Sequence, residues 1–114
     1  MQLAYQVPML QIVASNANFL SDPFRVPVGS NISMLYCVTA LVGAPAGTIQ
    51  LWFLNSNGDP VVVASVAVAA LGSGRSALSM SPEFIQFSLT QAGGANTLTM
   101  SVDFIVQPSN STPA

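Results

Sequence analysis

Few side chains in this sequence could carry out chemistry. The 114 residues include no histidine, no lysine and one cysteine, Cys37. A Ser-His-Asp or Cys-His site needs an imidazole base, and a Ser-Lys or Schiff-base site needs a lysine. Zinc sites draw their ligands mainly from several histidines and cysteines. All of these kinds of site are therefore excluded within the chain.

Carboxylates are the remaining candidates for catalysis, and there are four of them: Asp22, Asp59, Glu83 and Asp103. Two converging carboxylates could hydrolyse a glycoside. Three of the four lie next to prolines, however, where turn chemistry explains them. Asp103 lies within a predicted strand, where it faces solvent or pairs with Arg25 or Arg75. We therefore expect no catalytic residue, and a protein that is not an enzyme.

Metal and thiol chemistry have equally weak support. Asn55, Asn57 and Asp59 alternate like the start of a calcium loop, but no glutamate closes the loop at the required distance. A hairpin turn at Asn57-Gly58 is the simpler interpretation. Cys37 is expected to be a small buried hydrophobe, and a single cysteine allows no disulfide within the chain. We expect no metal and no cofactor.

The shortage of charge is the most informative feature. Only 5% of the residues are charged, against about 25% in an ordinary soluble domain, while 51% are hydrophobic. Two arginines cannot form the basic cluster that nucleic-acid binding requires. The surface either is covered by other subunits or is a neutral surface rich in Ser, Thr and Asn on a monomer. We favour the covered surface, because so few charges give little repulsion between copies.

Neither the N-terminal residues nor the longest apolar run predicts a membrane segment. Residues 61–71 form an apolar run of 11, whereas a spanning helix needs about 20. The N-terminal residues lack a basic region followed by a long apolar stretch, so we expect no signal peptide and synthesis in a host cytoplasm.

Apolar residues recur mostly with a period of two, which indicates β-strands. Residues 97–107 and 83–91 show this alternation, and the glycines between them predict a β-hairpin with its loop at residues 92–96. A helix beginning at Ser81-Pro82-Glu83 is the alternative, but its apolar face would be poor. Further strands are expected at residues 3–7, 9–14, 19–26, 32–42, 48–54 and 61–68. Gly72-Ser73-Gly74 is interpreted as a flexible turn.

This pattern predicts an all-β fold: a two-sheet antiparallel β-sandwich of seven or eight short strands, either Ig-like or jelly-roll. Residues 1–107 are expected to form a single domain. Prolines interrupt residues 1–27, which could be an N-terminal arm or edge strands. Residues 108–114 are expected to form a flexible tail.

Five apolar residues are candidate interface residues. Trp52 and Leu54 share a strand face with Thr48 and Gln50, and a large aromatic residue on a polar face suits an interface anchor. Burial of Trp52 in the core is the alternative that the sequence leaves open. Tyr5, Phe19 and Phe24 could dock an N-terminal arm.

These observations favour a structural subunit that associates with itself. The hypothesis is a small virion protein, such as a capsid, decoration or cement protein, that contacts itself and other capsid proteins through apolar surfaces. A filament or coat subunit of cellular origin is a variant of it. The alternative is a binding module, lectin-like or receptor-binding, that uses the Asn- and Asp-containing loops at residues 15–18, 55–59 and 92–96.

Overall fold

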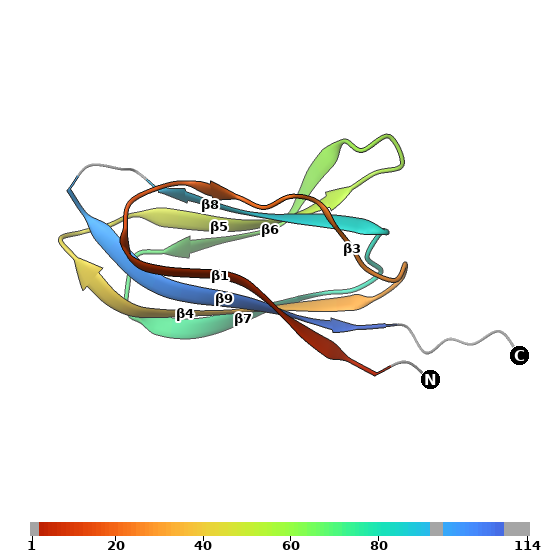
Figure 1. The fold of residues 1–114 in the computed structure, drawn as a ribbon, viewed down its shortest axis with the longest axis horizontal. Helices are drawn as coiled ribbons and strands as arrows, with labels where there is room; N and C mark the ends of the chain where they lie inside the picture. The colour runs from red at the N-terminus through yellow and green to blue at the C-terminus, as the bar shows by residue number, and fades with distance from the viewer. Residues whose placement is uncertain (1–2, 92–94, 109–114) are drawn as a thin grey trace, which may run out of the picture.

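The computed structural model describes residues 3–91 and 95–108, and in these ranges it contains nine strands in two antiparallel sheets and no helix (Figure 1). The predicted two-sheet β-sandwich is confirmed. Sheet A has the order β1 (Tyr5–Ser15), β9 (Thr97–Gln107), β4 (Asn31–Val42) and β7 (Gly72–Leu78). Sheet B has β8 (Phe84–Gln91) paired with β2 (Phe19–Leu20) and β3 (Phe24–Arg25) on one side, then β5 (Gly47–Leu54) and β6 (Pro60–Val68). No helix among the described residues is long and apolar enough to cross a membrane.

The strands pair in a nested order around one central hairpin. β5 pairs with β6, β4 with β7, β8 with β2 and β3, and β1 with β9. Successive pairs of this nest belong alternately to sheet B and sheet A. A long hairpin wrapped in this way is a jelly roll, with β2 and β3 acting as one interrupted strand. The topology therefore identifies a jelly roll rather than an Ig-like sandwich, a choice that the sequence left open.

The predicted hairpin between residues 83–91 and 97–107 is wrong. β8 pairs with β5 in sheet B, whereas β9 pairs with β1 and β4 in sheet A, so the connection crosses from one sheet to the other. Apolar and polar residues alternate in both strands because each strand turns one face to the shared core. This alternation carries no information about which strand each of them pairs with. Part of the predicted loop, residues 92–94, lies outside the described residues.

Two further strand predictions differ from the structure. Gly72-Ser73-Gly74 is the start of β7, not a turn, and the ring of Tyr36 on β4 occupies the space that a Cβ on Gly74 would need. Near the N-terminus, the two strands predicted at residues 3–7 and 9–14 are one edge strand, β1, which begins at Tyr5 and passes through Pro8 with a register shift between Pro8 and Leu10. Residues 19–26 split into β2 and β3, which brings the strands to nine; residues 109–114 of the predicted tail are not described.

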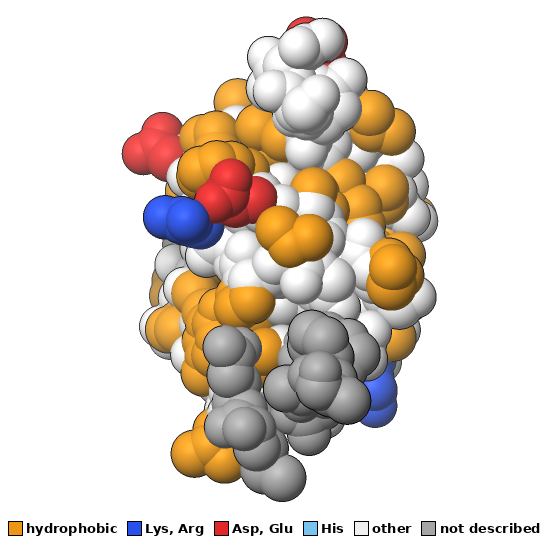
Figure 2. Space-filling view, turned by 90° about the vertical axis from the view of Figure 1, so that its right-hand side faces the viewer, with side chains coloured by type: hydrophobic (Ala, Val, Ile, Leu, Met, Phe, Trp, Pro, Cys, Tyr) orange, Lys and Arg blue, Asp and Glu red, His pale blue; other side chains and the backbone are white. Residues whose placement is uncertain are grey.

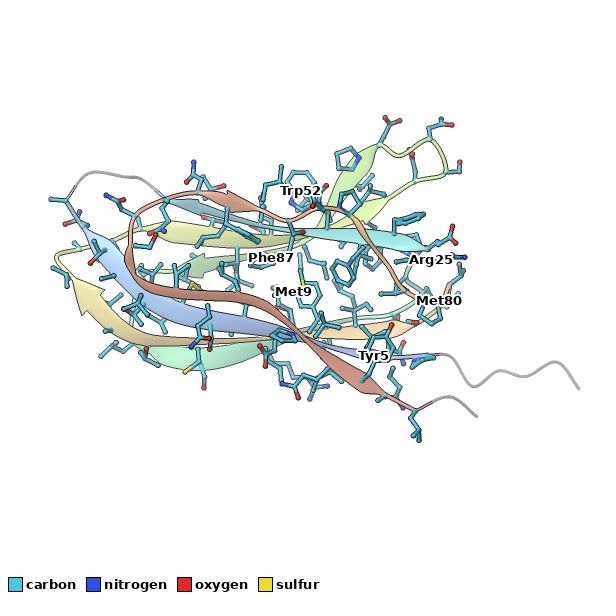
Figure 3. All side chains as sticks on the ribbon, in the orientation of Figure 1. Tyr5, Met9, Arg25, Trp52, Met80 and Phe87 are labelled. Atoms are coloured by element: carbon cyan, nitrogen blue, oxygen red, sulfur yellow. The ribbon has the colours of Figure 1, made fainter. Side chains whose placement is uncertain are left out.

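The core lies between the two sheets and is held together by aromatic contacts across them. Phe87 of β8 meets Phe104 of β9 edge to face, with ring centroids 5.8 Å apart and an angle of 85°. Phe19 packs on Phe87 and Phe24 on Phe104, with centroids 6.1 Å and 5.8 Å apart. In Figure 3, Phe87 and Met9 lie between the two layers. These contacts attach the short strands β2 and β3 to the core.

A matched pair of phenylalanines on β8 tests this assignment of faces. Phe87 is 0% exposed and Phe84 is 41% exposed. Phe87→Ala should lower the free energy of unfolding by about 3–5 kcal/mol, because it opens a cavity between the sheets. Phe84→Ala should lower it by about 1 kcal/mol or less. Urea denaturation followed by far-UV circular dichroism measures both, and equal losses would contradict the assignment.

Candidate assembly surface

The side of sheet B that faces away from the core, which we call the outer face of sheet B, is uncharged over its three longest strands. β5, β6 and β8 contain no Asp, Glu, Lys or Arg. Their outward side chains are mainly hydroxyl, amide and apolar groups, with Gln50, Ser65 and Ser88 in one row across the strands. Such a face presents little repulsion to a second neutral surface.

Trp52 lies on the outer face of sheet B, not in the core. It is opposite Gln86 of β8 and Val62 of β6, and its side chain is partly buried. The indole Nε1–H donates a hydrogen bond of 2.9 Å to Ser88 Oγ. Figure 3 shows Trp52 on the opposite side of its layer from Phe87. The ring is thus held in one orientation, with its donor satisfied and part of its apolar surface still accessible.

Leu54 lies at the end of β5, where it lines a groove of about 570 Å³. Val28, Pro82 and Phe84 form its other apolar walls, the turn at residues 55–58 forms its polar side, and Glu83 also lines it. Val28 is 71% exposed. Figure 2 shows this end of the molecule, with hydrophobic side chains distributed below the projecting turn and a group of charged side chains at the upper left. The groove therefore combines apolar walls with amide groups.

The turn between β5 and β6 is organised by the side chain of Asn55. Its Oδ1 accepts hydrogen bonds from the backbone N–H groups of Asn57 and Asp59, at 2.9 Å and 3.0 Å. Asn55 N–H donates to the Asp59 carbonyl at 3.0 Å, and Gly58 has the positive φ, 85°, that such a turn requires. A calcium ion in this loop would need Asn55 Oδ1 as a ligand, but that oxygen already accepts the hydrogen bonds that hold the turn together. The described residues include no group of three His, Cys, Asp or Glu side chains suited to a metal.

The three N-terminal candidates lie in edge strands. Tyr5 is at the start of β1, opposite Val106, and is 41% exposed. Phe19 and Phe24 point inward and pack on Phe87 and Phe104, so most of their apolar surface contacts this chain's own core. Their geometry differs from that expected of a docking arm, because the interrupted strands still pair with β8.

The three loops proposed as a joint binding site do not come together. The turn at residues 55–59 lies at the end of sheet B where β8 begins, since Phe53 is opposite Ile85. Asn18 lies at the other end, where its Oδ1 accepts a 2.7 Å hydrogen bond from Gln91 N–H. Asn96 is hydrogen-bonded to Ala44, next to the β4–β5 connection at that same far end. Among the described residues of these three loops, only residues 55–58 line the groove.

Among the described strands of sheet B, only β3 carries a charged side chain. Arg25 of β3 lies opposite Phe84, points away from the core and forms an exposed ion pair of 2.8 Å with Glu83. Asp103 accepts a 2.5 Å hydrogen bond from Gln6 Nε2 on the outward side of sheet A. Arg75 lies there too, beside a shallow hollow of about 440 Å³ that Cys37 also lines. An exposed ion pair such as Arg25–Glu83 contributes little to stability.

Four exposed apolar residues near the Asn55 turn were not singled out by sequence reasoning. They are Val28, Val61, Val62 and Phe84. The run of valines predicted a strand, but the sequence did not show that this strand would be an edge. β6 is an edge strand because the other side of β5 is paired with β8. That pairing joins residues that are distant in the sequence.

Comparisons with known proteins support the fold. No family model matches the sequence, and none of the curated proteins matches it. The structure is similar to a chain of Bacillus endospore appendages, described as a novel family of disulfide-linked pili, with a TM-score of 0.64 and 16% identity over 94% of this chain and 88% of that chain. A chain containing the CBM22-1–GH10 modules of Clostridium thermocellum xylanase 10B, complexed with xylohexaose, gives a TM-score of 0.43 and 15% identity over 80% of this chain and 19% of that chain. The chain belongs to the jelly-roll class of β-sandwiches by its own topology.

The Asn55 turn can be tested separately from the rest of the surface. Asn55→Ala should destabilise the fold by about 1–2 kcal/mol, because two backbone N–H groups lose their acceptor. Ser56→Ala, in the same exposed turn, is the control and should change stability by less than about 0.5 kcal/mol. Thermal unfolding measures both. An Asn55→Ala variant as stable as Ser56→Ala would contradict the proposed role of the side chain.

Proposed function

We propose that this protein is a non-enzymatic structural subunit that associates with copies of itself through the outer face of sheet B. The observation that carries the proposal is the absence of charge from β5, β6 and β8 together with the fixed, partly accessible Trp52. A neutral face needs little desolvation of ions when a second neutral surface covers it. Aromatic residues held in one rotamer are typical anchors of such contacts.

The assembly we propose is a surface structure: a virion lattice with capsid proteins as further partners, or a filamentous appendage. Its location would be the virion or the cell exterior. The similarity to the Bacillus endospore appendage chain favours the filamentous form, because that chain has the same fold over nearly its whole length and comes from a pilus. Cys37, the one cysteine here, lies partly buried in the middle of β4, so we propose contacts that are non-covalent.

Truncating Trp52 tests this function. Trp52→Ala should weaken self-association by at least tenfold, about 1.4 kcal/mol or more, because an anchor residue is lost. Gln50→Ala is the matched control, since Gln50 lies on the same strand and face, and it should have a small effect. Sedimentation velocity over a range of concentrations gives both values. A wild-type protein that stays monomeric at high concentration, or a Trp52→Ala variant that assembles normally, would refute the proposal.

A second candidate function is a binding module, and the groove beside Leu54 and Phe84 is the observation that favours it. Its apolar walls and the amide groups of residues 55–58 suit a neutral, polar ligand such as a glycan. The groove lies at the tip of the sandwich, so such a module could work alone or at the end of an assembly.

Glycan binding can be measured directly on an array, with and without calcium. If the groove binds a sugar, Phe84→Ala and Asn57→Ala should each reduce the signal at least tenfold. Thr90→Ala, at the far end of β8, should leave the signal unchanged. The Asn55 hydrogen bonds imply that binding does not depend on calcium, and binding lost with a chelator or with Asp59→Ala would instead indicate a calcium-assisted site. No signal from the wild-type protein would remove this candidate.

A further inference from the structure

Each sheet of a sandwich has two edges whose backbone groups can pair with another chain. Of the four edges here, two are interrupted and a third carries a charge. β1 has register shifts after Pro8 and after Ile12, and Ala14 has a positive φ of 48°. β2 and β3 have two residues each and are separated by the segment containing Pro23. β7 carries the exposed Arg75. Prolines, bulges, short strands and charges are the features that prevent an edge from pairing.

β6 is the exception among the described strands. It spans nine residues, Pro60–Val68, with five valines and no charged side chain, and its one proline is its first residue. Its one irregularity is a bulge at Val63, because Leu51 lies opposite Ala64 and Trp52 opposite Val62, and residues 64–68 pair with β5 without interruption. No other described strand lies on its far side. Such an edge can accept a further antiparallel strand.

We infer that β6 pairs antiparallel with β6 of a second copy of this chain, across a two-fold axis. This inference rests on the proposed function and adds to it a second contact, along the edge of sheet B, beside the contact through its outer face. β1 and β2–β3 are interrupted, and β7 pairs with β4 without a register shift but carries the exposed Arg75. Residues 64–68 of β6 therefore form the one regular, uncharged edge among the described strands. An antiparallel pair of identical strands is self-complementary, so it closes into a dimer. No like charges meet, because β6 has none.

The pairing would join the two sheets B into one continuous sheet across the dimer. Val62 and Trp52, which lie opposite each other on β6 and β5, would then belong to an outer face twice as wide. With residues 64–68 of one copy opposed to the same residues of the other, the two Ser65 side chains are diagonal neighbours on that face. Diagonal Cβ atoms in a sheet are about 7–8 Å apart, so charges placed there interact.

A charge swap at Ser65 tests the pairing. Ser65 is exposed and points to the outer face of sheet B. Ser65→Lys and Ser65→Glu should each weaken the dimer at least tenfold, because identical charges become neighbours across the axis. Mixing the two variants should restore the dimer, since Lys then lies beside Glu. Ala77→Lys adds the same charge to the exposed outward side of sheet A, away from β6 and from the outer face of sheet B, and should leave the dimer intact.

Native mass spectrometry and sedimentation velocity identify the species, and circular dichroism confirms that every variant is folded. Restoration on mixing supports the two-fold pairing. A dimer that Ser65→Lys leaves unchanged overturns it while leaving self-association by another surface intact. Loss without restoration on mixing also overturns it, because β6 would then meet a different strand. A monomeric wild type would reject the proposed function itself.

Discussion

The packing of the two inner faces against each other is the constraint on which the rest of this structure depends. Phe87 and Phe104 meet across the gap between the sheets, and the alternating residues around them are almost completely buried. Burial of this apolar area is the dominant favourable term in folding. It commits every second residue of β5, β8 and β9 to the interior, so the character of the surface is set by the residues in between. In this chain those residues are almost all uncharged.

The sequence predicted the strands and their faces well because both follow from local alternation. The inward set of β9, from Leu98 to Val106, is the one that the period of two indicated. Pairing could not be predicted in the same way. The partner of a strand is determined by contacts between residues that are distant in the sequence. β8 and β9 show the same alternation of apolar and polar residues, although they belong to different sheets. β7 was missed because Gly74 lacks the side chain that marks a strand, and the ring of Tyr36 fills the space instead.

The candidate surface was predictable in part. The position of Trp52 on the face of Thr48 and Gln50 follows from the strand period, but the choice between core and surface needed the pairing of β5 with β8 and the bond to Ser88. Phe19 and Phe24 were assigned to an arm because prolines flank them, and the structure turns both towards the core. The exposure of the edge strand β6 depends on topology alone. Composition therefore led to the hypothesis of self-association, whereas the choice of the surface proposed for it required the fold.

The mass of the native species in solution tests the central claim most directly, because it needs no substitution and no partner. The claim is that a surface with so few charges is covered by other copies of the chain. Native mass spectrometry of the wild-type protein over a wide range of concentrations should show dimers and larger species, with multiples of 11.8 kDa, that increase with concentration. A single 11.8 kDa species at every concentration would contradict the account.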